Sequence, residues 1–184
     1  SDELIEALLS DAHERMKKSV ENSRDKLSTV RTGRASPALL DRVQVDYYGT
    51  STPINQMANI AAAEARLLTI SPYDKSALQQ IEKAIIDSDL GLTPNNDGNV
   101  IRIQIPELTE ERRADMVKQV KQLAEEGRVS VRNVRRDVMH ELKELRTGGD
   151  VGEDDEKRGE ADLQKLTDKH VGEIDTLLAH KESD

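Results

Sequence analysis

The chain has no cysteine, no tryptophan and no phenylalanine, and only three tyrosines among its 184 residues. Without cysteine it cannot form disulfides, bind metal through thiolates or use a cysteine nucleophile. With so few aromatic rings, a core must be built from Leu, Ile, Val, Ala and Met, which favours helix packing. The scarcity also argues against an RNA-recognition sheet, because such a sheet stacks bases on aromatic side chains.

Long hydrophobic runs are missing as well. No apolar stretch approaches the roughly 20 residues that a membrane-crossing helix needs. The first residues, Ser1-Asp2-Glu3, are acidic where a secretory signal would be basic. Together with the absence of cysteine, these features predict a soluble, cytoplasmic protein that has no membrane partner.

The formal net charge is -9, which argues against indiscriminate nucleic-acid binding because a uniformly acidic surface repels phosphate at long range. Within a Debye length of about 8 Å at physiological salt, however, a local arginine cluster dominates the field that a docked phosphate experiences. The distribution of charge along the chain therefore matters more than its sum.

Three long segments repeat apolar residues at the spacing of an amphipathic helix. The first runs from Leu4 to about Val30, with a stop expected near Gly33. In the second, residues 109–146, the core-facing positions are spaced 4, 3, 4, 4, 3, 4, 4 and 3 apart, which predicts a helix of roughly 57 Å. The third begins with the acidic run 153–156. Because each helix must bury its apolar face, we predict a three-helix bundle.

Between the first and second helices the periodicity changes to that of strands and short helices. Val43, Val45 and Tyr47 alternate with polar residues, and this alternation predicts a strand. The other expected elements are a short helix from Ser36 to Arg42, strands at 57–60, 67–71 and 100–105, a helix at 74–88 and a surface loop at 91–98. This segment therefore predicts a small α/β unit inserted into a helical protein.

These elements predict an α+β protein whose helical domain is discontinuous. The bundle would comprise residues 1–30 and 107–184, and the inserted α/β domain would comprise residues 31–106. Two chain crossings join the domains, at 31–33 and 104–107, and few residues resist bending there. The predicted hinge residues are Arg31, Thr32, Gly33, Ile105 and Pro106.

Nothing in the sequence predicts an enzyme. The four histidines, His13, His140, His170 and His180, are scattered without metal-ligand spacing, so we expect no metal, and His170 is predicted to pack at a core-facing position. Carboxylates are numerous but lie on helix surfaces, and acid/base catalysis needs a concave, desolvated setting. A phosphate-binding glycine loop and a G-x-S-x-G motif are both absent. A hydrolase that uses surface carboxylates is the weakest of the functions considered.

One cluster on the long helix stands out. Arg128, Arg132, Arg135 and Arg136 fall within about 100° of arc beside the core stripe, and no acid occurs among residues 127–136. An ion-paired, solvated helix face is the ordinary alternative, but such faces alternate in sign and this one does not. Because guanidinium binds phosphate bidentately and keeps its charge, we predict an anion-binding surface with RNA backbone as the favoured target.

A second basic group, Arg24, Lys26, Arg31 and Arg34, lies at the end of the first helix and at the predicted hinge. Its charges fit pairing with the helix C-terminal dipole as well as they fit a functional role.

Several stretches of the chain are similar to one known family. They are Val30 to Pro37 (VRTGRASP), Tyr47 to Thr50 (YYGT), Ser88 to Asn95 (SDLGLTPN), Leu108 to Arg113 (LTEERR) and Val129 to Arg136 (VSVRNVRR). With these stretches in this order, the chain resembles the bacterial ribosome recycling factors from about residue 3 to residue 182.

The resemblance implies an L-shaped protein, expected to be a monomer, with a three-helix bundle and a β/α/β-sandwich-like insert on a hinge. It implies binding to large-subunit rRNA of the post-termination ribosome and subunit dissociation with elongation factor G, which binds and hydrolyses the GTP. It implies no cofactor and no catalysis. Among the arginines, the resemblance singles out Arg132 as essential, and Arg31, Arg128, Arg135 and Arg136 follow. A helical adaptor that scaffolds proteins without RNA contact is the alternative.

The sequence departs from the family's pattern at three places. Gly127 stands where alanine is expected, and a glycine inside a helix costs about 1 kcal/mol. His170 stands where an aromatic residue is expected, and the chain stops at Glu182-Ser183-Asp184, short of an apolar tail. These departures predict lower stability and leave the arginine motif intact.

Overall fold

The computed structural model describes residues 2–184, and the chain folds as two compact units. One unit combines residues 2–30 with 114–183, and the other comprises residues 31–113. Helices form the first unit, and a small antiparallel sheet with short helices forms the second. The predicted α+β class is confirmed. Across residues 2–184, none of the helices has the length and apolar character needed to span a membrane.

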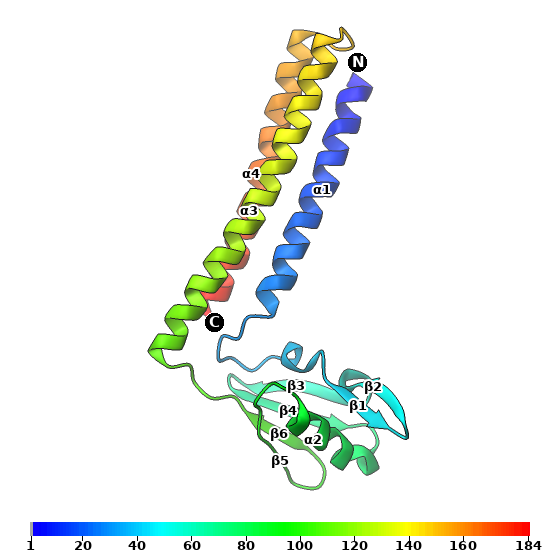
Figure 1. The fold of residues 1–184 in the computed structure, drawn as a ribbon, viewed down its shortest axis with the longest axis vertical. Helices are drawn as coiled ribbons and strands as arrows, with labels where there is room; N and C mark the ends of the chain where they lie inside the picture. Colours follow the sequence, from blue (N-terminus) through cyan, green and yellow to red (C-terminus); the bar gives the residue numbers. More distant parts are fainter. Residues whose placement is uncertain (1) are drawn as a thin grey trace. The chain divides into compact units, whose positions relative to one another are not determined.

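The first unit is a bundle of three helices that lie side by side, with α3 antiparallel to the other two (Figure 1). The helices are α1 (Asp2–Ser28), α3 (Glu110–Thr147) and α4 (Glu153–Ser183). All three contribute fully buried side chains to one core, for example Met16 from α1 and Leu142 from α3. The predicted three-helix bundle is therefore confirmed.

Local hydrogen bonds determine where these helices begin and end. α1 stops at Ser28, two residues before the predicted end, because the hydroxyls of Ser28 and Thr29 donate to backbone carbonyl oxygens one turn back. The N-cap prediction for α3 is confirmed, since Thr109 Oγ1 accepts from the backbone N–H of Arg112 at 3.2 Å. At its other end, Gly149 adopts a φ of +82° and closes the helix.

The second unit contains a two-stranded hairpin and a four-stranded sheet with strand order β3-β4-β6-β5, and every pairing is antiparallel. The strands are β1 (Gln44–Tyr47), β2 (Thr50–Pro53), β3 (Ala58–Glu64), β4 (Leu67–Pro72), β5 (Pro94–Asn96) and β6 (Ile101–Gln104). The helices are α2 (Leu78–Asp87) and the short 3-10 turns Pro37–Leu40, Ile54–Gln56 and Lys75–Ala77.

One core joins the hairpin, the sheet and α2. Ile81 and Ile85 of α2 are fully buried in the same cluster as Val45 of the hairpin and Ile70 and Ile103 of the sheet. The inserted unit is thus layered around its helix, as a β/α/β sandwich requires.

Two segments of this unit form strands that were not predicted. The stretch 91–98 was expected to be a loop, but Pro94–Asn96 forms an edge strand paired with β6, where proline is tolerated because no partner needs its missing N–H. Thr50–Pro53 also forms a strand that was not predicted, and it pairs with β1. Gly49, with a φ of +81°, belongs to the tight turn that joins β1 to β2.

The two segments that lead out of the second unit are fastened to its own sheet. The turn between β3 and β4 holds both of them: Ala65 accepts from the backbone N–H of Ala35 at 2.7 Å, and Arg66 accepts from that of Ile105 at 2.8 Å. The Arg66 guanidinium also pairs with Glu107 at 2.6 Å. These contacts fasten both segments to the second unit, which comprises residues 31–113.

Candidate anion-binding surface

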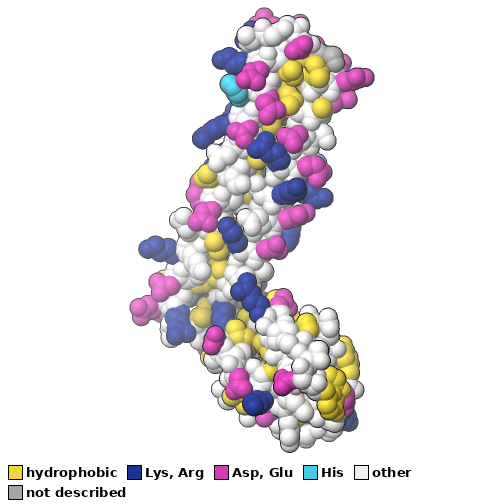
Figure 2. Space-filling view, turned by 45° about the vertical axis from the view of Figure 1, so that its right-hand side comes forward, with side chains coloured by type: hydrophobic (Ala, Val, Ile, Leu, Met, Phe, Trp, Pro, Cys, Tyr) yellow, Lys and Arg dark blue, Asp and Glu magenta, His cyan; other side chains and the backbone are white. Residues whose placement is uncertain are grey.

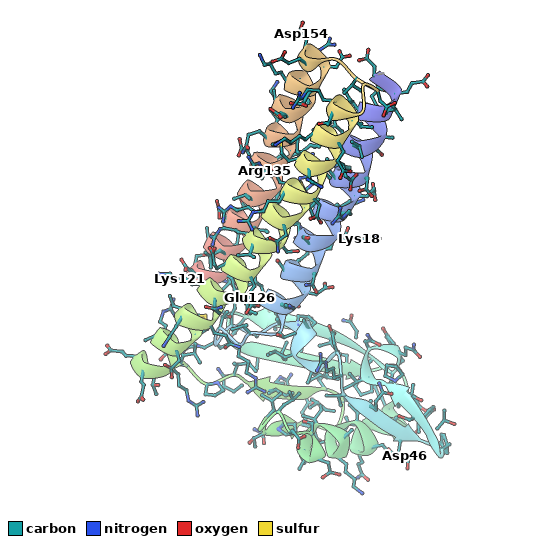
Figure 3. The ribbon with its side chains drawn as sticks, turned by 45° about the horizontal axis from the view of Figure 1, so that its top comes forward. Lys18, Asp46, Lys121, Glu126, Arg135 and Asp154 are labelled. Carbon is teal, nitrogen blue, oxygen red and sulfur yellow. The ribbon has the colours of Figure 1, made fainter. Side chains whose placement is uncertain are left out.

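Four arginines line the outer side of α3, next to a stripe of buried valines. Arg132 and Arg136 are exposed, and Arg128 and Arg135 are partly covered. Figure 3 shows the Arg135 side chain on α3, and Figure 2 shows cationic and anionic side chains intermixed on the visible face of the bundle. The arginines are therefore grouped on one helix, but they are not isolated from carboxylates.

Arg128 is the most firmly held of the four. Its Nε donates to Asp175 Oδ1 of α4 at 2.7 Å and its Nη1 donates to Glu125 Oε2 at 3.1 Å, and only 19% of its side chain is exposed. Burial alone would lower the pKa of the Arg128 guanidinium, but the hydrogen bonds to Asp175 and Glu125 raise it overall, so the group stays charged. Arg128 thus ties α3 to α4.

The other three arginines have weaker internal partners. Arg135 Nε donates to the neutral Gln164 of α4 at 2.9 Å, and Arg136 reaches Asn133 at 3.4 Å. Arg132 Nη1 lies 3.7 Å from Glu125 Oε1, beyond hydrogen-bond distance, and 46% of its side chain is exposed. Arg132 and Arg136 are consequently the two that can turn most readily toward an external anion.

Two carboxylates near the arginines were missed at the level of sequence. Glu125 lies outside the acid-free stretch 127–136 but precedes Arg128 by three residues and Arg132 by seven, a spacing that returns to the same helix face. That periodicity could have identified it. Asp175 comes from another helix, and nothing in the local pattern of α3 predicts its contact with Arg128.

The predicted site residue Arg31 belongs to the other compact unit. There its Nη2 donates to the backbone carbonyl of Leu90 at 2.5 Å. Of the predicted hinge residues, Thr32 and Ile105 are buried, and Gly33 adopts a φ of +83° that side chains rarely tolerate. A Cβ at Gly33 would also lie 3.1 Å from Leu108 Cγ, so the first crossing needs a glycine here.

The structure explains two of the departures in the bundle. A Cβ at Gly127 would lie 2.1 Å from Ser23 Oγ and 3.1 Å from Ile174 Cδ1, so glycine makes room for the buried serine. This crowding gives a structural reason for glycine at this position, and its effect on stability stays a prediction. His170 is buried, as predicted for a core-facing position; its Nδ1 lies 2.7 Å from the Leu166 carbonyl oxygen, and its ring packs edge-on against His13.

No group of three or more His, Cys, Asp or Glu side chains within residues 2–184 is arranged to hold a metal ion. The arginine surface carries permanent positive charges, which suit it to binding an anionic partner.

Comparison with known proteins gives matches over nearly the whole chain. The sequence profile of the family described as "Ribosome recycling factor" matches residues 23–184. The chain is 59% identical over 176 residues to the ribosome-recycling factor of Rubrobacter xylanophilus, covering 96% of this chain and 95% of the relative. It is 54% identical to that of Syntrophomonas wolfei, with 98% of both chains covered.

Solved structures give the same result. A solution structure of the ribosome recycling factor matches with a TM-score of 0.77 and 42% identity, covering 97% of this chain and 95% of the other. The ribosome recycling factor of T. thermophilus, described with the E. coli elongation factor G bound to the E. coli post-termination complex, matches with a TM-score of 0.71 and 46% identity, and 97% of each chain is covered.

Proposed function

The chain belongs to the ribosome recycling factor family, and we propose that it binds the post-termination ribosome through large-subunit rRNA and, with elongation factor G, separates the subunits. The related T. thermophilus factor is described together with elongation factor G on a post-termination complex, which supports both partners. We propose that it acts as a cytoplasmic monomer and makes or breaks no covalent bond itself, since elongation factor G hydrolyses the GTP.

The observation that carries this proposal is the state of Arg132 and Arg136. Both are exposed on one face of a 38-residue helix, and within residues 2–184 neither donates a hydrogen bond to a carboxylate. A guanidinium fork in this position can meet an RNA phosphate bidentately, and a long helix packed into a bundle presents it without reorganisation. Arg135 can release its neutral partner, whereas Arg128 contributes mainly by holding α3 and α4 together.

We propose that the segments that join the two units bend when the insert moves. We propose that the bundle anchors on rRNA while elongation factor G moves the insert, with bending at Arg31 to Gly33 and at residues 104–107. The backbone hydrogen bonds of Ala35 and Ile105 to the turn between β3 and β4 support this proposal, because they transmit force from the sheet to both crossings.

A subunit-splitting assay with purified post-termination ribosomes tests the function. We expect splitting only when the chain, elongation factor G and GTP are all present, and we expect Arg132→Ala to abolish it while the helical circular dichroism signal stays unchanged. Splitting without elongation factor G, or normal splitting by folded Arg132→Ala, would reject the proposed mechanism.

A helical adaptor without RNA contact is the second candidate. The internal partners of Arg128 and Arg135 favour it, because side chains that are satisfied within the protein need no ligand. Ribosome binding that does not respond to salt would support the adaptor.

A further inference from the structure

Glu125 is shared between two arginines of the anion-binding surface. Its Oε2 accepts a hydrogen bond from Arg128 Nη1 at 3.1 Å, while its Oε1 lies 3.7 Å from Arg132 Nη1. One oxygen is therefore engaged in a normal hydrogen bond, and the other only balances the charge of Arg132. The carboxylate therefore stands beside one of the two exposed arginines of the surface.

The contact of Glu125 with Arg128 is more firmly held than its contact with Arg132. Arg128 is 19% exposed and is also bound to Asp175 of the neighbouring helix, so it holds Glu125 in a fixed place. Arg132 and Glu125 are 46% and 53% exposed, and their contact is long. An exposed pair of this kind shifts an equilibrium by at most about fivefold, so a phosphate can displace it.

A phosphate that docks on Arg132 meets Glu125 in two ways. It must replace the carboxylate as the partner of the guanidinium, and it then lies within a few ångströms of a second negative charge that Arg128 prevents from leaving. Both effects oppose binding, and both act well inside the Debye length of about 8 Å, so physiological salt does not remove them.

We propose that Glu125 is a built-in counter-ion of Arg132 that RNA phosphate must displace, and that Arg128 and Asp175 are the positioning residues that keep it there. The inference rests on the proposed function, because it assumes that Arg132 contacts rRNA. Glu125 lowers the affinity of the surface and speeds release, which suits a factor that must leave the ribosome after each round.

The test compares Glu125→Gln with Glu126→Gln in binding to isolated large subunits at physiological salt. Both variants remove one exposed negative charge from adjacent positions on α3. Glu126, labelled in Figure 3, has only a 3.5 Å contact with Gln122 and pairs with no arginine of the surface among the described residues. It therefore controls for the change in net charge.

We expect Glu125→Gln to bind about two- to fivefold more tightly than the unchanged chain, mainly through slower dissociation, and Glu126→Gln to show at most a much smaller gain. Circular dichroism and the melting temperature check that both variants are folded. No gain in Glu125→Gln, or an equal gain in both variants, overturns the counter-ion role.

Large-subunit binding by Arg132→Ala, measured in the same experiment, distinguishes a failure of this inference from a failure of the proposed function. If Arg132→Ala loses binding while Glu125→Gln behaves like the unchanged chain, the counter-ion is wrong and the rRNA surface stands. If folded Arg132→Ala binds normally, the proposed surface itself is wrong.

Discussion

Three arginines of the insert and two arginines of α3 differ in how firmly the protein holds them. In the insert, Arg31, Arg66 and Arg102 each have a close internal acceptor: a backbone carbonyl at 2.5 Å, Glu107 at 2.6 Å and Asp97 at 2.8 Å. On α3, the contacts that Arg132 and Arg136 make with the described residues are longer, at 3.7 and 3.4 Å. The difference teaches that the number of arginines does not define a binding surface. What defines it is how many of them the fold leaves without a strong partner.

The largest expected effect is on large-subunit binding, when a weakly held arginine is replaced and compared with a closely paired one. Arg132→Ala should weaken large-subunit binding by at least about tenfold, because a charge-assisted phosphate contact contributes about 1.5–3 kcal/mol. Arg102→Ala removes the same charge from a paired position in the insert and should leave affinity unchanged. Equilibrium binding to purified large subunits measures both affinities. Equal losses of affinity in both variants would show that only net charge matters.

Glycine provides the next comparison. Gly33→Ala should destabilise the insert by about 1–2 kcal/mol, because its φ of +83° disfavours a side chain and Leu108 is close. Gly172→Ala, in open space on α4, should stabilise the bundle by up to about 1 kcal/mol. Denaturant unfolding of each variant measures both changes. A neutral Gly33→Ala would remove the conformational argument for glycine at the first crossing.

Within the bundle, Gly127→Ala should destabilise by about 1 kcal/mol, since overpacking against Ser23 outweighs the better helix propensity of alanine. The double variant Gly127→Ala/Ser23→Ala should recover this loss, because it removes the clashing hydroxyl. Thermal unfolding of the single and double variants provides the measurement. A more stable Gly127→Ala single variant would mean that Ser23 does not require the glycine.

The smallest effect concerns pH at the turn between β5 and β6. A hydrogen bond from Arg102, and then the backbone N–H groups of Val100 and Asn99, hold the pKa of Asp97 well below its ordinary value of 3.8. The ionised Asp97 therefore stabilises the folded protein above pH 3.8, and this stabilisation is lost as the pH falls toward the lowered pKa. The stability difference between the unchanged chain and Asp97→Asn should therefore be constant near neutrality and shrink below about pH 4. A constant difference down to pH 2 would contradict it.

The three long helices and the arginine cluster could be predicted from the sequence. The amphipathic repeats dictate the helices, and the arginine cluster and the family resemblance both lie within contiguous residues. The strand Pro94–Asn96 could not be predicted, because turn-forming residues mask a pairing that only β6 provides. Nor could the Asp175 contact of Arg128 or the clash behind Gly127, since both join helices far apart in sequence. Local periodicity identifies a face, but the partners that neutralise that face come from tertiary packing.

The salt dependence of large-subunit binding tests the central claim most directly. If the bundle contacts about four phosphates, log K against log salt should fall with a slope near -3, at about 0.7 to 0.9 per phosphate. Arg132→Ala removes one contact and should make the slope shallower by about 0.7 to 0.9. A binding constant that stays flat across the salt range would contradict an rRNA-binding arginine surface.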